Sequence, residues 1–140
     1  MWWIYALLSS ITAALVAIFG KVGLKNVDST LATTLRSVIM AVFLLLSATA
    51  LGKFSGFSVA SLAGRDWLFI ALAGIAGALS WLFYFFALKI GLVNQVVVID
   101  RLSLVFVVIL SAIFLGEAFT WKTALGAALM VGGALIIVLG

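Results

Sequence analysis

The sequence predicts an all-helical integral membrane protein with five transmembrane helices. Its 140 residues are 67% hydrophobic and only 9% charged, whereas soluble domains are about half apolar and roughly a quarter charged. A chain of this size cannot hide so much apolar surface from water, so its solvent is expected to be the bilayer. The apolar runs are longer than barrel strands and do not alternate in polarity, which excludes a membrane barrel.

Five apolar runs are long enough to cross a hydrocarbon core of about 30 Å, which takes roughly 20 helical residues. They cover residues 2–23, 29–51, 67–88, 92–115 and 121–139. No Lys or Arg precedes the first run, whereas a secretory signal needs a basic leader. The first run is therefore expected to be a retained helix, and residues 1–140 are expected to form one transmembrane domain.

The segments between the runs carry turn and capping signals. Asp28, Ser29 or Thr30 can cap the second helix, and Thr120 can cap the fifth. Residues 52–66 form the one long connection, and the sequence KIG forms a tight turn before the fourth helix. Each run therefore begins and ends where a helix is expected to do so.

The composition excludes several kinds of site. The chain has no cysteine, histidine or proline, so it has no disulfide and no thiolate zinc site, and we expect no metal and no cofactor. Its net charge of +4 is spread along the chain, which does not predict a nucleic-acid partner. No nucleophile lies beside a base at mid-depth, so an enzyme is not expected.

The loop charges do not select an orientation in the membrane. With five spans the termini lie on opposite faces, and each face carries three basic residues. These are Lys53, Arg65 and Lys122 on the N-terminal face and Lys21, Lys25 and Lys89 on the other. Because the two faces carry equal numbers of basic residues, the positive-inside rule predicts no preferred orientation. Either weaker signals set the topology, or the chain inserts both ways and pairs as an antiparallel dimer.

Charged and aromatic residues gather at one depth. At 1.5 Å per residue, Arg36 and Asp100 both lie roughly 10–13 Å inside the membrane from the same face. Trp81 and Tyr84 approach that face on the third helix and fall roughly 6–11 Å from it. Buried charges are costly unless they are paired or hydrated. The layer is therefore either a structural clamp between two helices or a water-accessible substrate site.

The adjacent charges Asp100 and Arg101 point about 100° apart on a helix and pair poorly with each other. Asp100 shares its helical face with Ser103, and Arg36 is its natural partner. Two arginines against one aspartate leave one positive charge unmatched, which favours a substrate site. We expect that site to comprise Arg36, Trp81, Tyr84, Asp100, Arg101 and Ser103.

Small residues indicate where helices approach closely. Gly74 and Gly77 form a smooth notch on the third helix. The simpler interpretation is that another helix of the same bundle packs into it. Gly126, Gly132 and Gly133 lie on the fifth helix. A five-helix monomer gives that helix few internal partners, so we expect it to form a subunit interface.

Several motifs in this order resemble an EamA domain of the drug/metabolite transporter superfamily. They are YFFALKIG, the turn FLGEAFTW and the last helix GAALMVGGALI. The segments IDRLS and IFGKVGLKNVDSTLATTLRS resemble the short, single-domain bacterial and archaeal members with five spans. The resemblance covers nearly the whole chain.

The resemblance implies a membrane carrier. Longer members join two such halves in inverted orientation, so a single half is expected to form a homodimer around a shared cavity. Those members usually carry a proline in the fourth helix, where this chain has Asp100 and Arg101. The implied location is the inner membrane of a prokaryote.

The expected function is alternating-access transport of a small polar metabolite, such as an amino acid or an organic anion. Arg36 and Arg101 would bind carboxylate or phosphate, and Trp81 and Tyr84 would form an apolar wall. Asp100 would orient an arginine, bind an amine or carry a coupling proton. Two alternatives remain: a non-transporting membrane subunit that stabilises a larger complex, and a flippase component for lipid-linked sugars.

Overall fold

The computed structural model describes residues 1–58 and 62–140, which form helices joined by turns. The helices are α1 (Trp2–Gly23), α2 (Ser29–Ala50), α3 (Gly64–Ile90), α4 (Val93–Asp100), α5 (Ser103–Phe114) and α6 (Trp121–Leu139). α4 and α5 together make one span, so the described residues hold five spans long and apolar enough to cross a membrane. The predicted fold class is confirmed.

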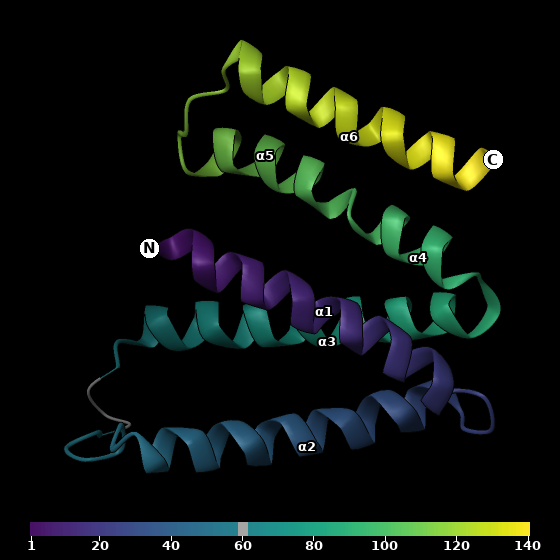
Figure 1. The fold of residues 1–140 in the computed structure, drawn as a ribbon. Coiled ribbons are helices and arrows are strands. Elements are labelled where there is room, and N and C mark those ends of the chain that lie inside the picture. The colour runs from purple at the N-terminus through teal and green to yellow at the C-terminus, as the bar shows by residue number, and fades with distance from the viewer. Residues whose placement is uncertain (59–61) are drawn as a thin grey trace. The chain divides into compact units, whose positions relative to one another are not determined.

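The chain divides into two compact units. One comprises Val22–Lys89 and is named here the α2–α3 unit; the other comprises Met1–Lys21 and Ile90–Gly140 and is named the α4–α6 unit. Within the α2–α3 unit, the two long helices run in opposite directions (Figure 1). Within the α4–α6 unit, α6 returns alongside both α4 and α5 (Figure 1).

Side-chain caps fix where the helices begin. The Asp28 carboxylate accepts hydrogen bonds from the backbone N–H groups of Thr30 and Leu31, at 2.9 and 3.2 Å. The Thr120 hydroxyl accepts from the N–H of Thr123 at 3.2 Å. Each cap satisfies a helix donor that otherwise has no partner. Asp28 and Thr120 are therefore confirmed as N-caps.

Glycines in the left-handed region end two helices. Gly52 follows α2 with φ of 64°, and Gly116 follows α5 with φ of 68°. Lys53 N–H reaches back to Ala48 O at 2.9 Å, and Gly52 N–H to Thr49 O at 2.9 Å. This pair of bonds satisfies the last carbonyls of α2 in the manner of a Schellman turn.

The third helix is longer than the predicted run 67–88. It begins at Gly64, because the Asp66 carboxylate accepts the Ala63 N–H at 3.2 Å and so caps the preceding turn. It continues to Ile90, where the Lys89 ammonium donates to Val27 O at 2.9 Å. Trp67 therefore lies within the first turn of α3 and does not begin the helix.

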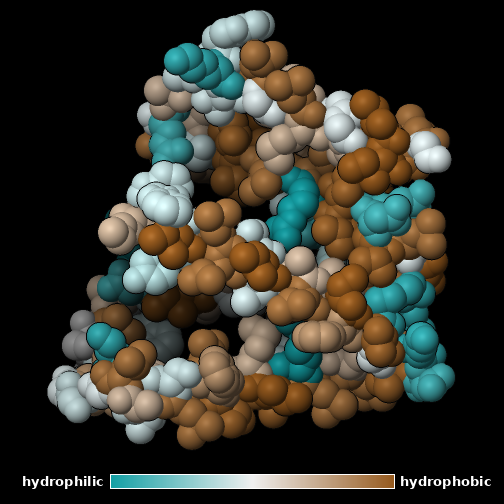
Figure 2. All heavy atoms as spheres, in the orientation of Figure 1, coloured by the Kyte–Doolittle hydropathy of each residue, from teal (hydrophilic) through white to brown (hydrophobic). Residues whose placement is uncertain are grey.

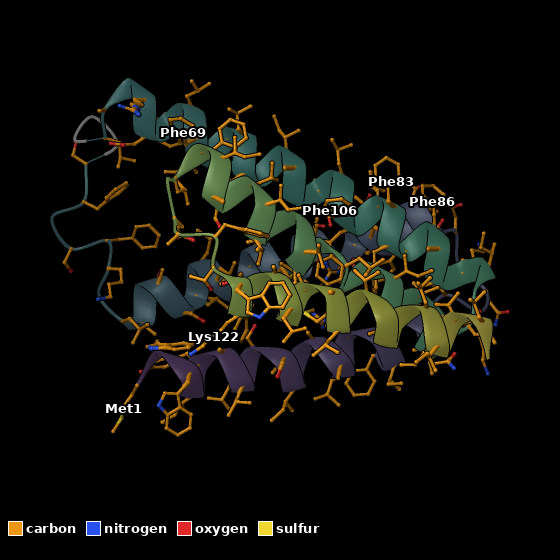
Figure 3. All side chains as sticks on the ribbon, turned by 90° about the horizontal axis from the view of Figure 1, so that it is seen from above. Met1, Phe69, Phe83, Phe86, Phe106 and Lys122 are labelled. Carbon is orange, nitrogen blue, oxygen red and sulfur yellow. The ribbon has the colours of Figure 1, made fainter. Side chains whose placement is uncertain are left out.

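The outward surfaces are hydrophobic, as a lipid-facing protein requires. Most of the face drawn in Figure 2 is apolar. Phe69, Phe83 and Phe86 project from the outer side of α3 in Figure 3 and are 57%, 69% and 47% exposed. In contrast, Phe85 and Leu88 on the same helix are buried. α3 thus separates a lipid-facing stripe from an inward stripe.

The fourth span is broken, which corrects the expectation of one continuous helix over residues 92–115. At Arg101 and Leu102 the pattern changes: Leu102 N–H bonds to Ile99 O at 2.9 Å, and Leu104 N–H to Arg101 O at 3.1 Å. These are three-residue steps of a 3₁₀ turn. Neither proline nor glycine lies here. The preceding β-branched residues 96–99 and Asp100 all have lower helix propensity than Leu or Ala.

Candidate functional site

Arg36 lies on α2 and packs against aromatic rings of α3. Its guanidinium carbon is 3.6 Å from the centre of the Trp81 ring and 5.2 Å from that of Phe85. Both distances lie within the range of a cation–π interaction. The negative face of an indole ring is thus held against a positive charge in the membrane-spanning part of the α2–α3 unit.

The aromatic rings form one cluster on α3. Trp81 and Tyr84 meet edge to face with ring centres 5.5 Å apart. Phe85 lies 5.9 Å from each of them. Positions 81, 84 and 85 share one helical face because they are three and four residues apart. The cluster presents a rigid apolar wall with the Tyr84 hydroxyl at its polar end.

The Arg36 charge has no counter-charge among the described residues of the α2–α3 unit. Its Nε is buried and has no hydrogen-bond acceptor. The hydroxyls of Thr33 and Ser37 on the same helix donate to Ser29 O at 2.7 Å and to Thr33 O at 2.8 Å, and neither accepts from Nε. Trp81 covers the face of the guanidinium and leaves the terminal Nη groups as the donors for an incoming group.

This arrangement suits a planar anion. A carboxylate or a phosphate can accept one N–H from each Nη group, which is the end-on form of a bidentate pair. The stacking on Trp81 holds the guanidinium plane in place and reduces the entropy lost on binding. The aromatic wall can then contact the apolar part of the same molecule.

Phe85 is the member of this cluster that the sequence reasoning missed. Its signal is the spacing of Trp81, Phe85 and Leu88 at intervals of four and three residues. Phe85 is 3% exposed and Leu88 is fully buried. This stripe identifies the inward face of α3, and an aromatic residue on it next to Trp81 is a candidate for the wall.

The other three predicted residues belong to the α4–α6 unit. Asp100 ends α4, Arg101 lies in the break, and Ser103 begins α5. Arg101 lines an apolar groove of about 230 Å³ together with Gly133 and Ala134 of α6. The structure therefore brings Arg36, Trp81 and Tyr84 together in one unit and Asp100, Arg101 and Ser103 in the other. The pairing of Arg36 with Asp100 stays a prediction.

Polar residues of α1 have a local role. Ser10 donates to Leu7 O at 2.8 Å, and Thr12 donates to Leu8 O and Ser9 O at 2.9 Å. Hydroxyls that bond back to their own helix are satisfied without an external partner. Within the described ranges, no three acidic, His or Cys side chains are grouped as metal ligands would be.

Comparison with known proteins gives consistent results. A family model described as the EamA-like transporter family matches residues 1–139. A protein from Sinorhizobium sp. named an uncharacterized transporter in the cobO 3' region is 41% identical over 136 residues. That match covers 97% of this chain and 95% of the relative. No solved structure matches the chain significantly. The predicted resemblance is confirmed, and the chain is an integral membrane protein that belongs to the EamA-like transporter family.

Proposed function

We propose that the protein is a secondary transporter of small metabolites that carry a carboxylate or phosphate group. It works by alternating access as a homodimer in a prokaryotic inner membrane. A transporter of some kind follows from the family. The class of cargo follows from the charge and surroundings of Arg36.

The observation that carries this proposal is the charge of Arg36, which no described residue of the α2–α3 unit neutralises. An arginine at the centre of a spanning helix costs about 2.5–3.5 kcal/mol on insertion scales. A desolvated cation–π contact returns about 2 kcal/mol or more, but it leaves the buried Nε without an acceptor. A structural clamp would supply a counter-ion. An exchangeable anionic cargo supplies one when it binds, which makes binding favourable.

The homodimer rests on the single five-helix unit and its loop charges. Each face of the membrane carries three basic residues, as a chain that inserts in both orientations requires. Two antiparallel copies would rebuild the inverted repeat of longer carriers. The α6 glycines Gly126, Gly132 and Gly133 are open to a neighbouring helix, because a Cβ added at each meets nothing within 4 Å in this chain.

Asp100, Arg101 and Ser103 lie at the break in the fourth span. In an alternating-access cycle, Asp100 orients an arginine and Ser103 binds polar cargo groups. The break at Arg101 and Leu102 favours movement of α4 against α5, because a 3₁₀ step within a span lacks the full ladder of α-helical bonds.

The test is thermal stabilisation of purified protein by candidate cargoes. A ligand that binds the folded protein raises its Tm in proportion to the logarithm of its concentration. We expect organic carboxylates, amino acids or phosphates to raise the Tm, and matched amines to leave it unchanged. The Arg36→Gln variant should lose this response. Arg65→Gln is the control, because Arg65 also lies over a ring, Phe69, but at 5.7 Å and on an exposed turn.

A response to cations alone would contradict the anion proposal. Exchange of the charges in an Arg36→Asp, Asp100→Arg double variant separates a carrier from a non-transporting subunit. A carrier loses transport while still accumulating as folded protein, whereas a subunit that uses the pair only for assembly keeps its function. A lipid-linked sugar would appear as stabilisation by polyprenyl phosphates and not by water-soluble anions.

A further inference from the structure

Two opposite charges lie next to each other at the break in the fourth span. Asp100 is the last residue of α4, and Arg101 follows it before α5 begins. Within the described residues of the α4–α6 unit, neither side chain forms an ion pair. Arg101 is exposed, and Asp100 is half-buried. Each charge therefore needs a partner in a region whose solvent is hydrocarbon.

The surface beside Arg101 is an apolar groove. It measures about 230 Å³, and Val98, Leu102, Met130, Gly133 and Ala134 line it with Arg101. A groove of this kind accepts aliphatic side chains. The combination of an apolar groove and a charge is suited to a protein surface that carries the opposite charge.

Gly133 lines the groove and contributes no side chain to fill it. A Cβ added there meets no atom within 4 Å, so packing inside the α4–α6 unit does not require a glycine. Glycine in a spanning helix permits close approach of another helix. No helix of the α4–α6 unit fills this space.

We infer that the occupant is a second copy of this chain, and that Arg101 of each subunit pairs with Asp100 of the other. A two-fold interface presents the same patch from both subunits, so residue i meets residue j and residue j meets residue i. A patch that carries one acid and one base side by side is complementary to its own two-fold copy. Two reciprocal pairs neutralise all four charges at once.

The depth of the pair fits this symmetry. Asp100 and Arg101 lie seven and eight residues after Val93, so they are roughly 10–12 Å from the start of the span and near the midplane. An axis in the membrane plane exchanges the two faces, and only groups near the midplane then meet their own equivalents. A two-fold axis along the membrane normal also brings them together, so the charge pair is compatible with an antiparallel or a parallel dimer.

This inference rests on the homodimer of the proposed function and specifies its charges. Arg101 is then neutralised by the partner subunit and does not bind cargo. Arg36 becomes the cation that each subunit offers to an anion. The interface is a property of assembly and can be measured without any cargo.

The test is an obligate heterodimer made from two charge variants. Asp100→Arg yields a chain with two cations at the break, and Arg101→Asp yields a chain with two anions. Neither can pair with itself, but the two can pair with each other. We expect each variant alone to lose the wild-type dimer, and co-expressed copies with different tags to co-purify as a mixed dimer. The Asp100→Arg, Arg101→Asp double variant keeps one charge of each sign and should dimerise with itself.

Three results would overturn the inference. They are normal dimers of either single variant, absence of the mixed dimer when both chains are present in the membrane, and a wild-type monomer whose groove retains a co-purified lipid. If a single variant does not accumulate alone, recovery of its level on co-expression with the other is the supporting result, and no recovery counts against the pairing. Failure of the anion response in the thermal assay would reject the cargo class and leave this interface standing.

Discussion

Arg36 and Arg101 lie well inside spanning segments and have contrasting surroundings. Arg36 belongs to the uninterrupted helix α2, where Trp81 covers the face of its guanidinium at 3.6 Å. Arg101 lies in the break between α4 and α5, exposed beside an apolar groove. The first charge is stabilised by a ring, whereas no described group of the α4–α6 unit pairs with the second.

This difference shows two ways of keeping a cation in hydrocarbon. An aromatic face lowers the cost of the charge without using its hydrogen-bond donors, so the donors stay available for a group that comes and goes. A charge that no aromatic ring contacts needs a permanent counter-ion. We therefore assign reversible binding to Arg36 and permanent pairing to Arg101.

The largest expected effect comes from placing methionine at each arginine. Arg36→Met should abolish the anion-dependent rise in Tm, since a charge-assisted bond contributes about 1.5–3 kcal/mol, or roughly ten- to hundred-fold in Kd. It should also raise the Tm without ligand, because a half-buried charge with no acceptor for its buried Nε is removed. Differential scanning fluorimetry measures both changes.

Arg101→Met should weaken the dimer and leave the anion-dependent rise in Tm intact. It leaves the carboxylate of Asp100 of the partner subunit unpaired, so the dimer should weaken by at least about ten-fold in Kd while the anion response persists. Light scattering over a dilution series measures the dimer. Equal behaviour of the two methionine variants would remove the distinction between the arginines.

The next effect concerns the ring beneath Arg36. Trp81→Leu removes the cation–π contact, which contributes up to about 2 kcal/mol when desolvated, and should raise the Kd for the anion by up to about 30-fold. Phe85→Leu should have a smaller effect because that ring centre lies 5.2 Å from the guanidinium. Phe83→Leu is the control, since Phe83 is exposed on the outer stripe of α3. Equal losses for Trp81→Leu and Phe83→Leu would show that the ring does not act through Arg36.

A smaller effect is expected from filling the groove. Gly133→Leu adds a side chain that meets nothing in this chain, and leucine favours helix, so the monomer should remain folded. The dimer should weaken several-fold, because the added side chain occupies the space of the partner. Gly74→Leu on α3 is the control, since a Cβ there also meets nothing within 4 Å. Chemical cross-linking in membranes would reveal the change, and an unaltered Gly133→Leu dimer would place the interface elsewhere.

Length and polarity were enough to predict the five spans, because a bilayer demands about 20 apolar residues for each crossing. The caps Asp28 and Thr120 were also predictable, because each depends on contacts within three residues. The break at Arg101 was not. It contains no proline or glycine, and the low helix propensity of the preceding residues is too weak a signal to distinguish a break from a continuous helix.

The candidate site was predictable in the same partial way. Counting residues along helices placed Arg36, Trp81 and Tyr84 at one depth, and the structure brings these three together. Depth alone does not give rotation about the helix axis. The stacking of the guanidinium on Trp81 and the inclusion of Phe85 depend on that rotation, which packing between helices determines.

The smallest expected effect lies outside the membrane, at the cap of α2. The hydrogen bond from Leu31 N–H, together with that from Thr30 N–H and the charge of Lys89, holds the pKa of Asp28 below its ordinary value. A depressed pKa in the folded state stabilises the fold above the unfolded value, near pH 4, and this contribution is lost as the pH falls through the folded pKa. Asp28→Asn keeps an acceptor for the helix N–H groups but has no charge to lose. We therefore expect the Tm of the wild-type protein to fall slightly further than that of Asp28→Asn between about pH 6 and pH 3, whereas Asp28→Ala should be less stable than the wild type at pH 6. Parallel Tm curves for wild type and Asp28→Asn would mean that the cap works by geometry and not by charge.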